Sequence, residues 1–234
     1  MKKFTKMWAI AACALFAGTA AVNAEDYTWK FVTAGDATTY AIRSDGSLWS
    51  WGWNEKGQGG NGVSERTATP TLADGNRVWK KAVGGKAYGF FLAEDGSLWA
   101  AGTHEGGVQG TNDGIDHKVL TRIGTDNDWA DMACSRFWGY SGFAIKTNGT
   151  LWAWGKNSAG QLGIGNTQAQ TAPVQVGADM DWKQVAAGCS SVLALKTDGS
   201  LWGWGFNMYS ELFGHEGKQL SPVRLGSETD WEQV

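Results

Sequence analysis

Short apolar runs and turn-forming residues alternate along this chain with a period of about 50 residues. The pattern is clearest in the octapeptide DGSLWxWG, where a turn dipeptide is followed by alternating apolar positions. Its four copies, lightly edited, begin at Asp45, Asp95, Asn148 and Asp198. Self-similarity at this period is typical of propellers, solenoids and other repeat arrays. The other residues can therefore be placed by their offset from the octapeptide.

Four segments recur in the repeating unit, and we label them a to d. Segment a is a short apolar run, led by proline in three copies and exemplified by Pro173–Val176. Segment b starts with tryptophan, as in Trp182–Val185, and segment c is apolar, as in Val192–Leu195. Segment d is the SLWxWG run, and each segment has the length of a strand. The Asp-Gly or Asn-Gly between c and d predicts a hairpin, because a type I′ turn needs positive φ at both central residues.

The alternation within segment d predicts how the sheets pack. Along Ser47–Trp51, the side chains of Trp49 and Trp51 point to one face and that of Leu48 points to the other. Both faces are apolar, which suits a sheet packed between two neighbours. We therefore predict an all-β protein, a β-propeller of four-stranded antiparallel blades with about four blades present. The octapeptide is expected to form the c–d turn and an inner strand of each blade, with its tryptophans in the core.

The order of the segments indicates how much of a propeller is present. They run bcd, abcd, abcd, abcd, ab, so that repeats cover about residues 29–78, 79–128, 129–181 and 182–230, and a fifth starts at 231. In a closed ring of four blades, the last segment, Trp231–Val234, would duplicate Trp29–Val32 and have no place. We expect residues 25–234 to be a propeller domain truncated at its C-terminus. The alternative is an open array that exposes sheet edges and associates with another copy.

The first 24 residues have the pattern of a secretory signal peptide. Lys2, Lys3 and Lys6 form a basic start, Met7–Phe16 is an apolar run, and small residues lead up to Ala24. The apolar run is too short for a membrane span. We expect cleavage near Ala24 and a secreted location (extracellular, periplasmic or cell-surface), with no membrane insertion afterwards.

Charge and cysteine content limit the classes of partner. The chain has 20 Lys and Arg against 23 Asp and Glu, and its basic residues form no long run. Clustered positive charge marks nucleic-acid binding, so we expect no nucleic-acid partner. Cys134 and Cys189 remain after signal cleavage. We expect two buried free thiols, with a disulfide as the alternative that an oxidising compartment permits.

The stretch after the third SLWxWG copy carries a family resemblance. Trp154–Gly165, WGKNSAGQLGIG, resembles the repeat of the regulator of chromosome condensation family, WGxNxxGQLGxG. The second copy departs from it, with Ala101, His104 and Val108 in place of Trp, Asn and Gln. The resemblance implies a seven-bladed propeller. Nuclear members of the family are exchange factors for a small GTPase and bind chromatin, roles that a secreted chain would not share. Secreted bacterial members, the propeller-type β-lactamase inhibitory proteins, bind an enzyme through loops on one face.

Departures from the repeat concentrate on one rim of the predicted propeller. If the strands are antiparallel, the b–c and d–a loops share this rim. Trp129 and Asn148 are 19 positions apart, where the other copies have 16, so the third b–c loop is three residues longer. The candidate partner-binding residues are Arg136, Phe137, Trp138 and Tyr140 in that loop, Phe206, Met208, Tyr209, Glu211 and Phe213 in the fourth d–a loop, and His104 in the second. Arg, Trp, Tyr and Met are enriched at interfaces.

We predict a secreted, non-catalytic binding module that recognises a protein partner, such as an extracellular or cell-envelope enzyme. We expect no catalytic, cofactor or metal site, because His104, His117 and His215 share no metal-ligand spacing and no nucleophile-elbow or phosphate-loop motif is present. A carbohydrate-binding or carbohydrate-cleaving propeller is the alternative function. A purely structural interpretation also stays open, in which the extra aromatic side chains only fill the wider loop. The sequence does not indicate an oligomeric state.

Overall fold

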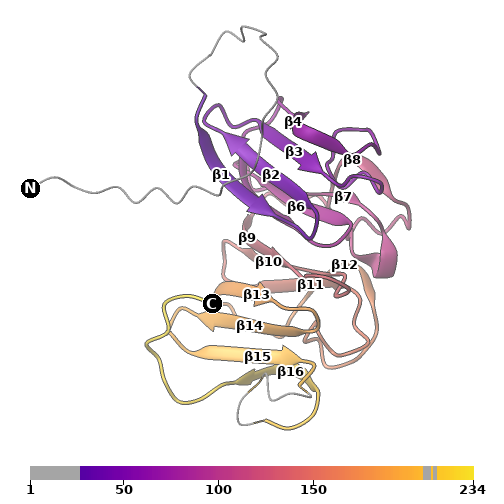
Figure 1. Ribbon diagram of the computed structural model, residues 1–234. Helices are drawn as coiled ribbons and strands as arrows, with labels where there is room; N and C mark the ends of the chain where they lie inside the picture. The colour runs from indigo at the N-terminus through magenta and orange to yellow at the C-terminus, as the bar shows by residue number, and fades with distance from the viewer. Residues whose placement is uncertain (1–26, 208–211, 213–214) are drawn as a thin grey trace, which may run out of the picture.

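The computed structural model describes residues 27–207, 212 and 215–234 (Figure 1). The predicted signal peptide lies outside the described residues, as do Met208, Tyr209, Glu211 and Phe213. The described part consists of four four-stranded antiparallel sheets and one short 3-10 helix, η1 (Glu105–Gly107). The prediction of an all-β propeller with four-stranded blades is confirmed. None of the described helical structure is long or apolar enough to span a membrane.

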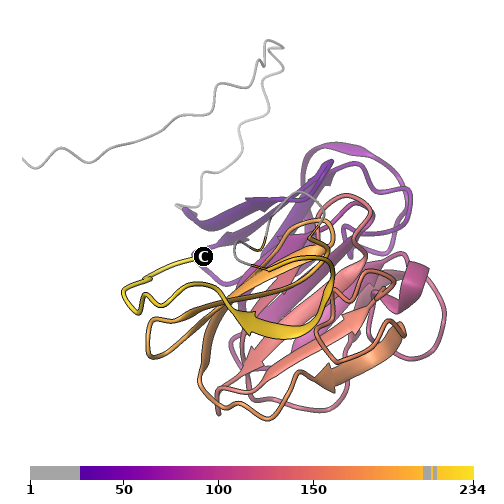
Figure 2. The same ribbon diagram turned by 90° about the horizontal axis from the view of Figure 1, so that it is seen from below.

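The sheets are successive blades along the chain, and Figures 1 and 2 show them side by side. Blade 1 contains β1 (Trp29–Ala34), β2 (Thr38–Arg43), β3 (Leu48–Gly52) and β4 (Thr67–Asp74). Blade 2 contains β5 (Trp79–Gly84), β6 (Tyr88–Ala93), β7 (Leu98–Gly102) and β8 (His117–Arg122). Blade 3 contains β9 (Trp129–Cys134), β10 (Ser141–Lys146), β11 (Leu151–Gly155) and β12 (Gln170–Gln175). Blade 4 contains β13 (Trp182–Ala187), β14 (Ser191–Lys196), β15 (Leu201–Gly205) and β16 (Gln219–Arg224).

Within each blade the strands pair in the order b, c, d, a, so segment a completes the sheet that precedes it in the chain. The b strands β1, β5, β9 and β13 line a common central cavity, and segment d is the third strand of each sheet. The expectation that the octapeptide forms an inner strand is therefore wrong. The b strands can approach one another closely around the propeller axis because they end in small residues such as Ala34 and Gly84. A Cβ on Gly84 would collide with the ring of Tyr40 and the backbone of Gly35.

The c–d turn is held by a chain of side-chain hydrogen bonds. In blade 1, Asp45 Oδ1 accepts from the Ser47 N–H at 2.9 Å and from its hydroxyl at 2.6 Å. Ser47 Oγ in turn accepts from the Trp49 indole N–H at 2.8 Å. Of the two turn residues only Gly46 has positive φ (86°), and its N–H donates to Arg43 O. The turn is thus not type I′, because the Asp side chain, rather than a left-handed Asp backbone, organises it.

A second tryptophan of the octapeptide joins neighbouring blades. Trp154 is completely buried, and its indole N–H donates to Val108 O, in the d–a loop of blade 2, at 2.7 Å. Its ring meets Phe90 of blade 2 edge to face, with centroids 5.1 Å apart. Trp204 repeats the bond from blade 4 to Gln161 O of blade 3 at 2.8 Å. The core is therefore a series of clusters between blades.

Lys146 and Lys196 each lie between two tryptophan rings, at the rim formed by the a–b and c–d turns. Lys146 Nζ lies 4.8 Å from the Trp129 ring centroid and 5.0 Å from that of Trp152. Its charge is paired with Asp126 at 2.6 Å and Asp128 at 3.1 Å. Although partial burial lowers the pKa of Lys146, these two carboxylates raise it above the usual value. The aspartates of the a–b turns thus stabilise the blade through ion pairs with a cation held by aromatic rings.

The Trp231–Val234 segment continues the pattern after blade 4. Trp231 N–H donates to Gly199 O at 3.3 Å, as Trp182 N–H donates to Gly149 O at 3.1 Å. Val234 N–H also donates to Gln184 Oε1 of β13 at 3.0 Å. The C-terminal residues therefore lie beside β13, in the position that segment b takes next to every preceding blade (Figure 1).

Replacing Trp154 with Ala should lower the free energy of unfolding by about 3–5 kcal/mol, because it leaves a large cavity between blades and an unpaired Val108 carbonyl. Urea denaturation measures the change. The matched control is Trp138→Ala, since that side chain is 62% exposed and its loss removes only surface contacts with Lys86 and Tyr140, at a cost of about 1 kcal/mol or less. Equal stability of both variants and the wild type would contradict the blade-joining role.

The turn aspartates should give stability a specific acid dependence. Hydrogen bonds from the serine hydroxyl and backbone N–H lower the pKa of Asp45, Asp95 and Asp198. A folded pKa below the unfolded value of about 3.9 stabilises the protein above that pH and loses this contribution as pH falls through the folded pKa. The triple Asp→Asn variant imitates Asn148, which accepts the same bonds from Thr150 in blade 3. Its urea midpoint should fall less steeply below about pH 4 than that of the wild type. Parallel pH curves would contradict this account.

Candidate partner-binding face

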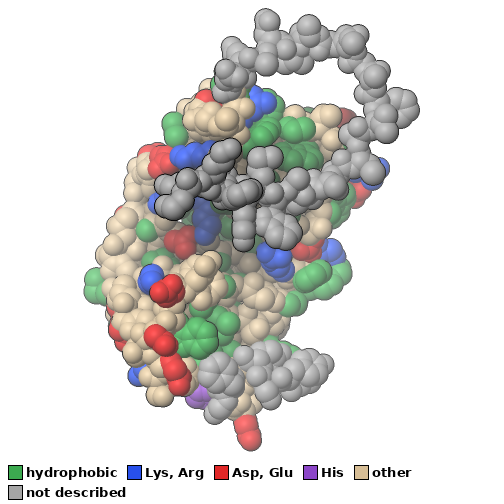
Figure 3. All heavy atoms as spheres, turned by 60° about the vertical axis from the view of Figure 1, so that its left-hand side comes forward, with side chains coloured by type: hydrophobic (Ala, Val, Ile, Leu, Met, Phe, Trp, Pro, Cys, Tyr) green, Lys and Arg blue, Asp and Glu red, His purple; other side chains and the backbone are tan. Residues whose placement is uncertain are grey.

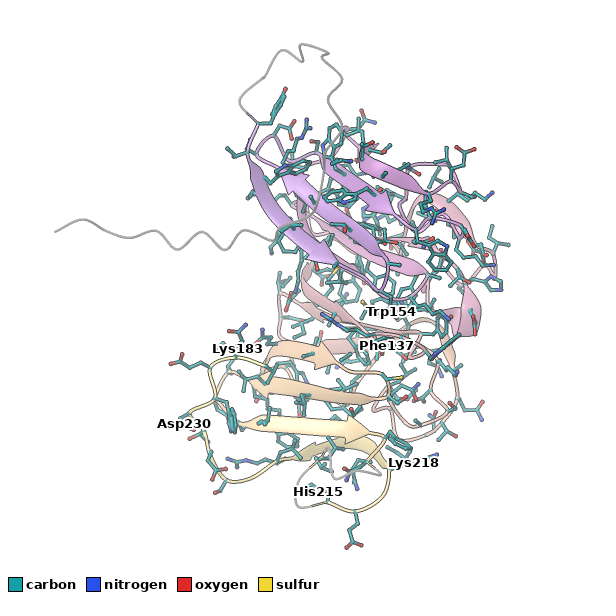
Figure 4. The ribbon with its side chains drawn as sticks, in the orientation of Figure 1. Phe137, Trp154, Lys183, His215, Lys218 and Asp230 are labelled. Carbon is teal, nitrogen blue, oxygen red and sulfur yellow. The ribbon has the colours of Figure 1, made fainter. Side chains whose placement is uncertain are left out.

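The four b–c loops meet at one rim of the molecule. Those of blades 1, 2 and 4 contain three residues each (35–37, 85–87 and 188–190), and that of blade 3 contains six, Ser135–Tyr140. We call Ser135–Tyr140 the inserted loop. Figure 4 shows Phe137 of this loop on the same side as Lys218 of a d–a loop, opposite Lys183 and Asp230. The structure therefore places both kinds of irregular loop on one rim.

The inserted loop contacts the b–c loops of all three other blades. Phe137 N–H donates to Asp36 Oδ1 of blade 1 at 3.4 Å. Lys86 Nζ of blade 2 lies 2.8 Å from the ring centroid of Trp138. Arg136 N–H donates to Gly188 O of blade 4 at 3.3 Å. One loop thus reaches across the rim at the end of the central cavity and is fixed from several directions.

Two aromatic side chains are exposed on this fixed loop. Phe137 is 61% exposed and Trp138 is 62% exposed. Phe137 also has a φ of 51°, which is unusual for a bulky residue and costs free energy unless neighbouring contacts enforce it. Rigid, exposed aromatic side chains are the typical anchors of protein interfaces, since little conformational entropy is lost when they are buried by a partner.

Tyr140 supports the loop from below. It is 3% exposed, and its ring packs against Tyr88 with centroids 5.9 Å apart. The Tyr88 hydroxyl donates to Ser135 O at 2.6 Å and so anchors the other end of the loop. Burial raises the pKa of Tyr140 to about 12, and the charge of Glu105 adds to the shift. Tyr140 was predicted to contact a partner, but its burial leaves it the role of supporting the loop. Its φ of 46° occurs where the chain turns back into β10.

The central cavity opens beneath the inserted loop. Its volume is about 240 Å³, and its wall includes Arg136, Cys134 and the ends of the four b strands. Burial raises the pKa of the Cys134 thiol to about 12, so the thiol is neutral at physiological pH. Cys134 and Cys189 are both free. Cys189 is exposed, contrary to the expectation of two buried thiols, because it lies in a b–c loop whereas Cys134 ends a strand.

The other predicted residues lie elsewhere on this rim or outside the described residues. Phe206 is half-buried at the start of the fourth d–a loop, and its N–H donates to the O of Ser190, the last residue of the b–c loop of blade 4. His104 is exposed in the second d–a loop, with its ring 2.7 Å from Asp116 Oδ1. Met208, Tyr209, Glu211 and Phe213 are outside the described residues. The structure brings Arg136, Phe137 and Trp138 together and leaves His104 in a separate loop.

The second d–a loop is held by its own Asp–His pairs. His117 Nε2 lies 2.7 Å from Asp113 Oδ2, and His104 Nδ1 pairs with Asp116. Burial acts to raise the pKa of Asp116, but hydrogen bonds from the backbone and ring of His104, together with the charge of Lys56, hold it below its usual value. Across residues 27–207, 212 and 215–234, no three His, Cys, Asp or Glu side chains form a group that could hold a metal ion.

Sequence reasoning missed two residues of the face. Asp36 and Lys86 occupy the middle of the short b–c loops, at the position where blade 3 carries its insertion. Each is unremarkable within its own repeat. An alignment of the four b–c loops would have drawn attention to both, because they are the charged residues of those loops in blades 1 and 2.

Comparison with known proteins agrees with the blade pattern. A family model described as the Regulator of chromosome condensation (RCC1) repeat matches residues 45–92 and 148–195, and a second model with this description matches residues 29–58. The chain belongs to the RCC1-repeat family. Both matches of the first model start at the c–d turn of one blade and end in segment c of the next, so the family's repeat unit is offset from the structural blade.

Curated relatives extend well beyond the matched part. Ultraviolet-B receptor UVR8 of Arabidopsis thaliana is 30% identical over 163 residues, which make up 68% of this RCC1-repeat chain and 37% of UVR8. Protein RCC2 of Homo sapiens is 27% identical over 150 residues, which make up 63% of this chain and 19% of RCC2. The chain therefore matches less than two fifths of the length of either relative.

Solved structures show the same fold. Human WBSCR16 has a TM-score of 0.75 at 18% identity, with 88% of this chain and 54% of WBSCR16 covered. Yeast RCC1 (Prp20), solved with Kap60 bound, has a TM-score of 0.74 at 22% identity, with 87% of this chain and 50% of the yeast chain covered. At these identities the likeness concerns the fold alone.

Replacing Gly139 with Ala should displace the inserted loop, because the added Cβ would collide with Ser135 Cβ and Cys189 O. Overpacking of this kind costs about 1–3 kcal/mol, and hydrogen exchange should quicken at the amides of residues 135–140. The control is Gly75→Ala, where the Cβ would meet only Leu72 methyl groups, the nearest at 3.6 Å. Unchanged exchange in the loop of the Gly139 variant would show that the loop is not fixed by these contacts.

Proposed function

We propose that this chain is a secreted, non-catalytic binding module of bacterial type, which recognises a protein partner through the rim that carries the inserted loop. The partner is an extracellular or cell-envelope enzyme. The observation that carries the proposal is the exposure of Phe137 and Trp138 on a loop held by the b–c loops of three other blades. Little reorganisation is needed before such a surface binds.

The use of the fold in similar proteins supports a protein-binding role. Yeast RCC1 (Prp20) was solved bound to Kap60, and Prp20p of Saccharomyces cerevisiae is described with binding properties to Gsp1p and histones. Kap60, Gsp1p and histones are partners of the yeast protein, and we do not assign them to this chain. What we carry over is only that proteins with this fold bind protein partners. In this chain the longest b–c loop presents the exposed aromatic residues.

Secretion and the absence of catalysis rest on the sequence. Lys2, Lys3 and Lys6, followed by the apolar Met7–Phe16 run, have the pattern of an export signal. In this chain the glycine-rich stretch that reads GQLGIG at residues 160–165 recurs in edited form in each repeat, which is typical of a structural turn rather than of a single reactive site. The partner rim carries no clustered metal ligands among the described residues.

The geometry of Trp138 weighs against the carbohydrate alternative. A sugar ring stacks on the open face of an aromatic side chain. Lys86 Nζ lies 2.8 Å from the Trp138 ring centroid and occupies one face of it. The Trp138 ring also packs against Tyr140, with centroids 6.4 Å apart, so its exposed remainder is better suited to packing against apolar side chains of a protein.

The double variant Phe137→Ala/Trp138→Ala should bind the partner at least about 30-fold more weakly, since truncating one interface hot spot costs about 2 kcal/mol or more. The immobilised wild-type chain is used to capture its partner from a secreted or envelope fraction, and the dissociation constant of the purified pair is then measured by biolayer interferometry. Thermal unfolding should be nearly unchanged, because both side chains are exposed.

Met180→Ala is the matched control, because Met180 is also 62% exposed but lies in an a–b turn on the opposite rim. Its affinity should equal that of the wild type. The proposal fails if the captured protein binds the double variant as tightly as the wild type, or if a glycan array shows saccharide binding that the double variant loses.

A further inference from the structure

We propose that the partner inserts a carboxylate, carried by an Asp or Glu of a protruding loop, at the mouth of the central cavity, where it pairs with the guanidinium of Arg136. Phe137 and Trp138 pack against the apolar residues that flank this carboxylate. This inference rests on the proposed function and specifies the chemistry of its partner.

The Arg136 guanidinium is available for such a pair. Its backbone N–H donates to Gly188 O, but its side chain makes no hydrogen bond or ion pair with any residue in the described ranges. In contrast, the guanidinium groups of Arg77 and Arg122 bind oxygens of their own turns. Arg136 is exposed and also forms part of the cavity wall. An arginine fork in this position matches the geometry of a carboxylate.

The surroundings of Arg136 favour an anion. The ionisable side chains in the cavity wall are Lys81, Arg136 and the neutral thiol of Cys134. Lys81 Nζ pairs with Asp131 Oδ1 at 2.5 Å and donates to Met132 O at 2.9 Å, so its charge is balanced within blades 2 and 3 and Arg136 is the cation that faces a ligand. The nearest acidic residue of the b–c loops, Asp36, accepts the Phe137 N–H and keeps its negative charge, but it forms no ion pair with Arg136 in the described part of the chain. Positive charge at the end of a concave wall concentrates the field on an approaching carboxylate.

The charge is local to the cavity mouth rather than spread over the molecule. On the face that Figure 3 shows, acidic and basic side chains are interspersed. The basic groups nearest the exposed aromatics are Arg136, in the same loop, and Lys86, which lies against Trp138. Burying an ion pair between Phe137 and Trp138 excludes water from it and strengthens the attraction between its charges.

The size of the cavity favours a side chain over a free small molecule. Its volume of about 240 Å³ lies below the range of roughly 300–1,000 Å³ that is usual for pockets holding small-molecule ligands. A single acidic side chain at the tip of a partner loop would fill its mouth while the rest of the partner rests on the rim. This mode needs no enclosed pocket.

A peptide selection tests the inference without knowledge of the natural partner. A phage library of random seven-residue loops closed by a disulfide is selected on the full chain and, in parallel, on the variants Arg136→Gln and Arg66→Gln. Arg66 is an exposed arginine at the end of the first d–a loop and serves as the matched control. The wild type and the Arg66 variant should enrich peptides with Asp or Glu beside an apolar residue.

The selected peptides are then synthesised and measured on each protein. Arg136→Gln should weaken binding of the acidic peptides at least about 10-fold. Arg136→Lys should restore part of the affinity, because lysine supplies the positive charge but not the bidentate geometry of the guanidinium. Replacing the peptide's Asp with Asn should weaken its binding to the wild type by a similar factor of about 10. The same replacement should leave its affinity for the Arg136→Gln variant almost unchanged. Arg66→Gln should bind as the wild type does.

The outcomes separate this inference from the proposed function. Peptides that lose binding to Phe137→Ala/Trp138→Ala but show no dependence on an acidic residue or on Arg136 overturn the carboxylate inference and leave the protein-binding rim standing. Peptides that bind the double variant as tightly as the wild type count against the rim itself. A selection that enriches nothing on the wild type counts against both.

Discussion

The stacking of one blade on the next is the constraint on which the rest of the molecule depends. A single four-stranded sheet of this chain has two apolar faces and can bury neither of them alone. The tryptophan near the end of segment d makes the connection, since Trp154 reaches into the d–a loop of blade 2 and Trp204 into that of blade 3. Because each contact joins consecutive units, the spacing of strands within the repeat must stay nearly constant. Changes of length are tolerated in the loops that lie away from these tryptophans.

The candidate partner-binding face follows from the same packing. The b strands end in small residues where they approach the axis, which brings the four b–c loops within reach of one another. Three added residues in blade 3 are then enough for one loop to touch the loops of blades 1, 2 and 4. The unusual backbone of Phe137 is stable because those contacts enforce it. A three-residue insertion in one of the repeated blades is therefore enough to form a rigid, exposed aromatic surface.

Sequence reasoning recovered the parts of the fold that local chemistry determines. Alternating apolar positions and turn dipeptides predicted the strands and the four-stranded sheets. Of the octapeptide tryptophans expected in the core, Trp154 and Trp204 are buried, whereas the first tryptophan of every copy is half-buried. The strand nearest the axis could not be read in this way, because it depends on crowding between blades, which is relieved by residues such as Gly84. The site was located by its insertion, yet Tyr140 and Trp138 look alike in sequence and differ completely in exposure. Asp36 and Lys86 belong to the face only through proximity in space.

The hydrogen bond between Phe137 and Asp36 joins residues that are 101 positions apart and belong to blades that do not follow one another. In a repeat protein whose units contact only their neighbours, stability behaves as a one-dimensional sum and the ends can unfold separately. The inserted loop adds one such bond between non-adjacent blades and so makes the array more cooperative. A partner that binds this loop would stabilise blade 1 as well as blade 3 against unfolding. Occupancy of the rim and the stability of distant blades are therefore thermodynamically linked.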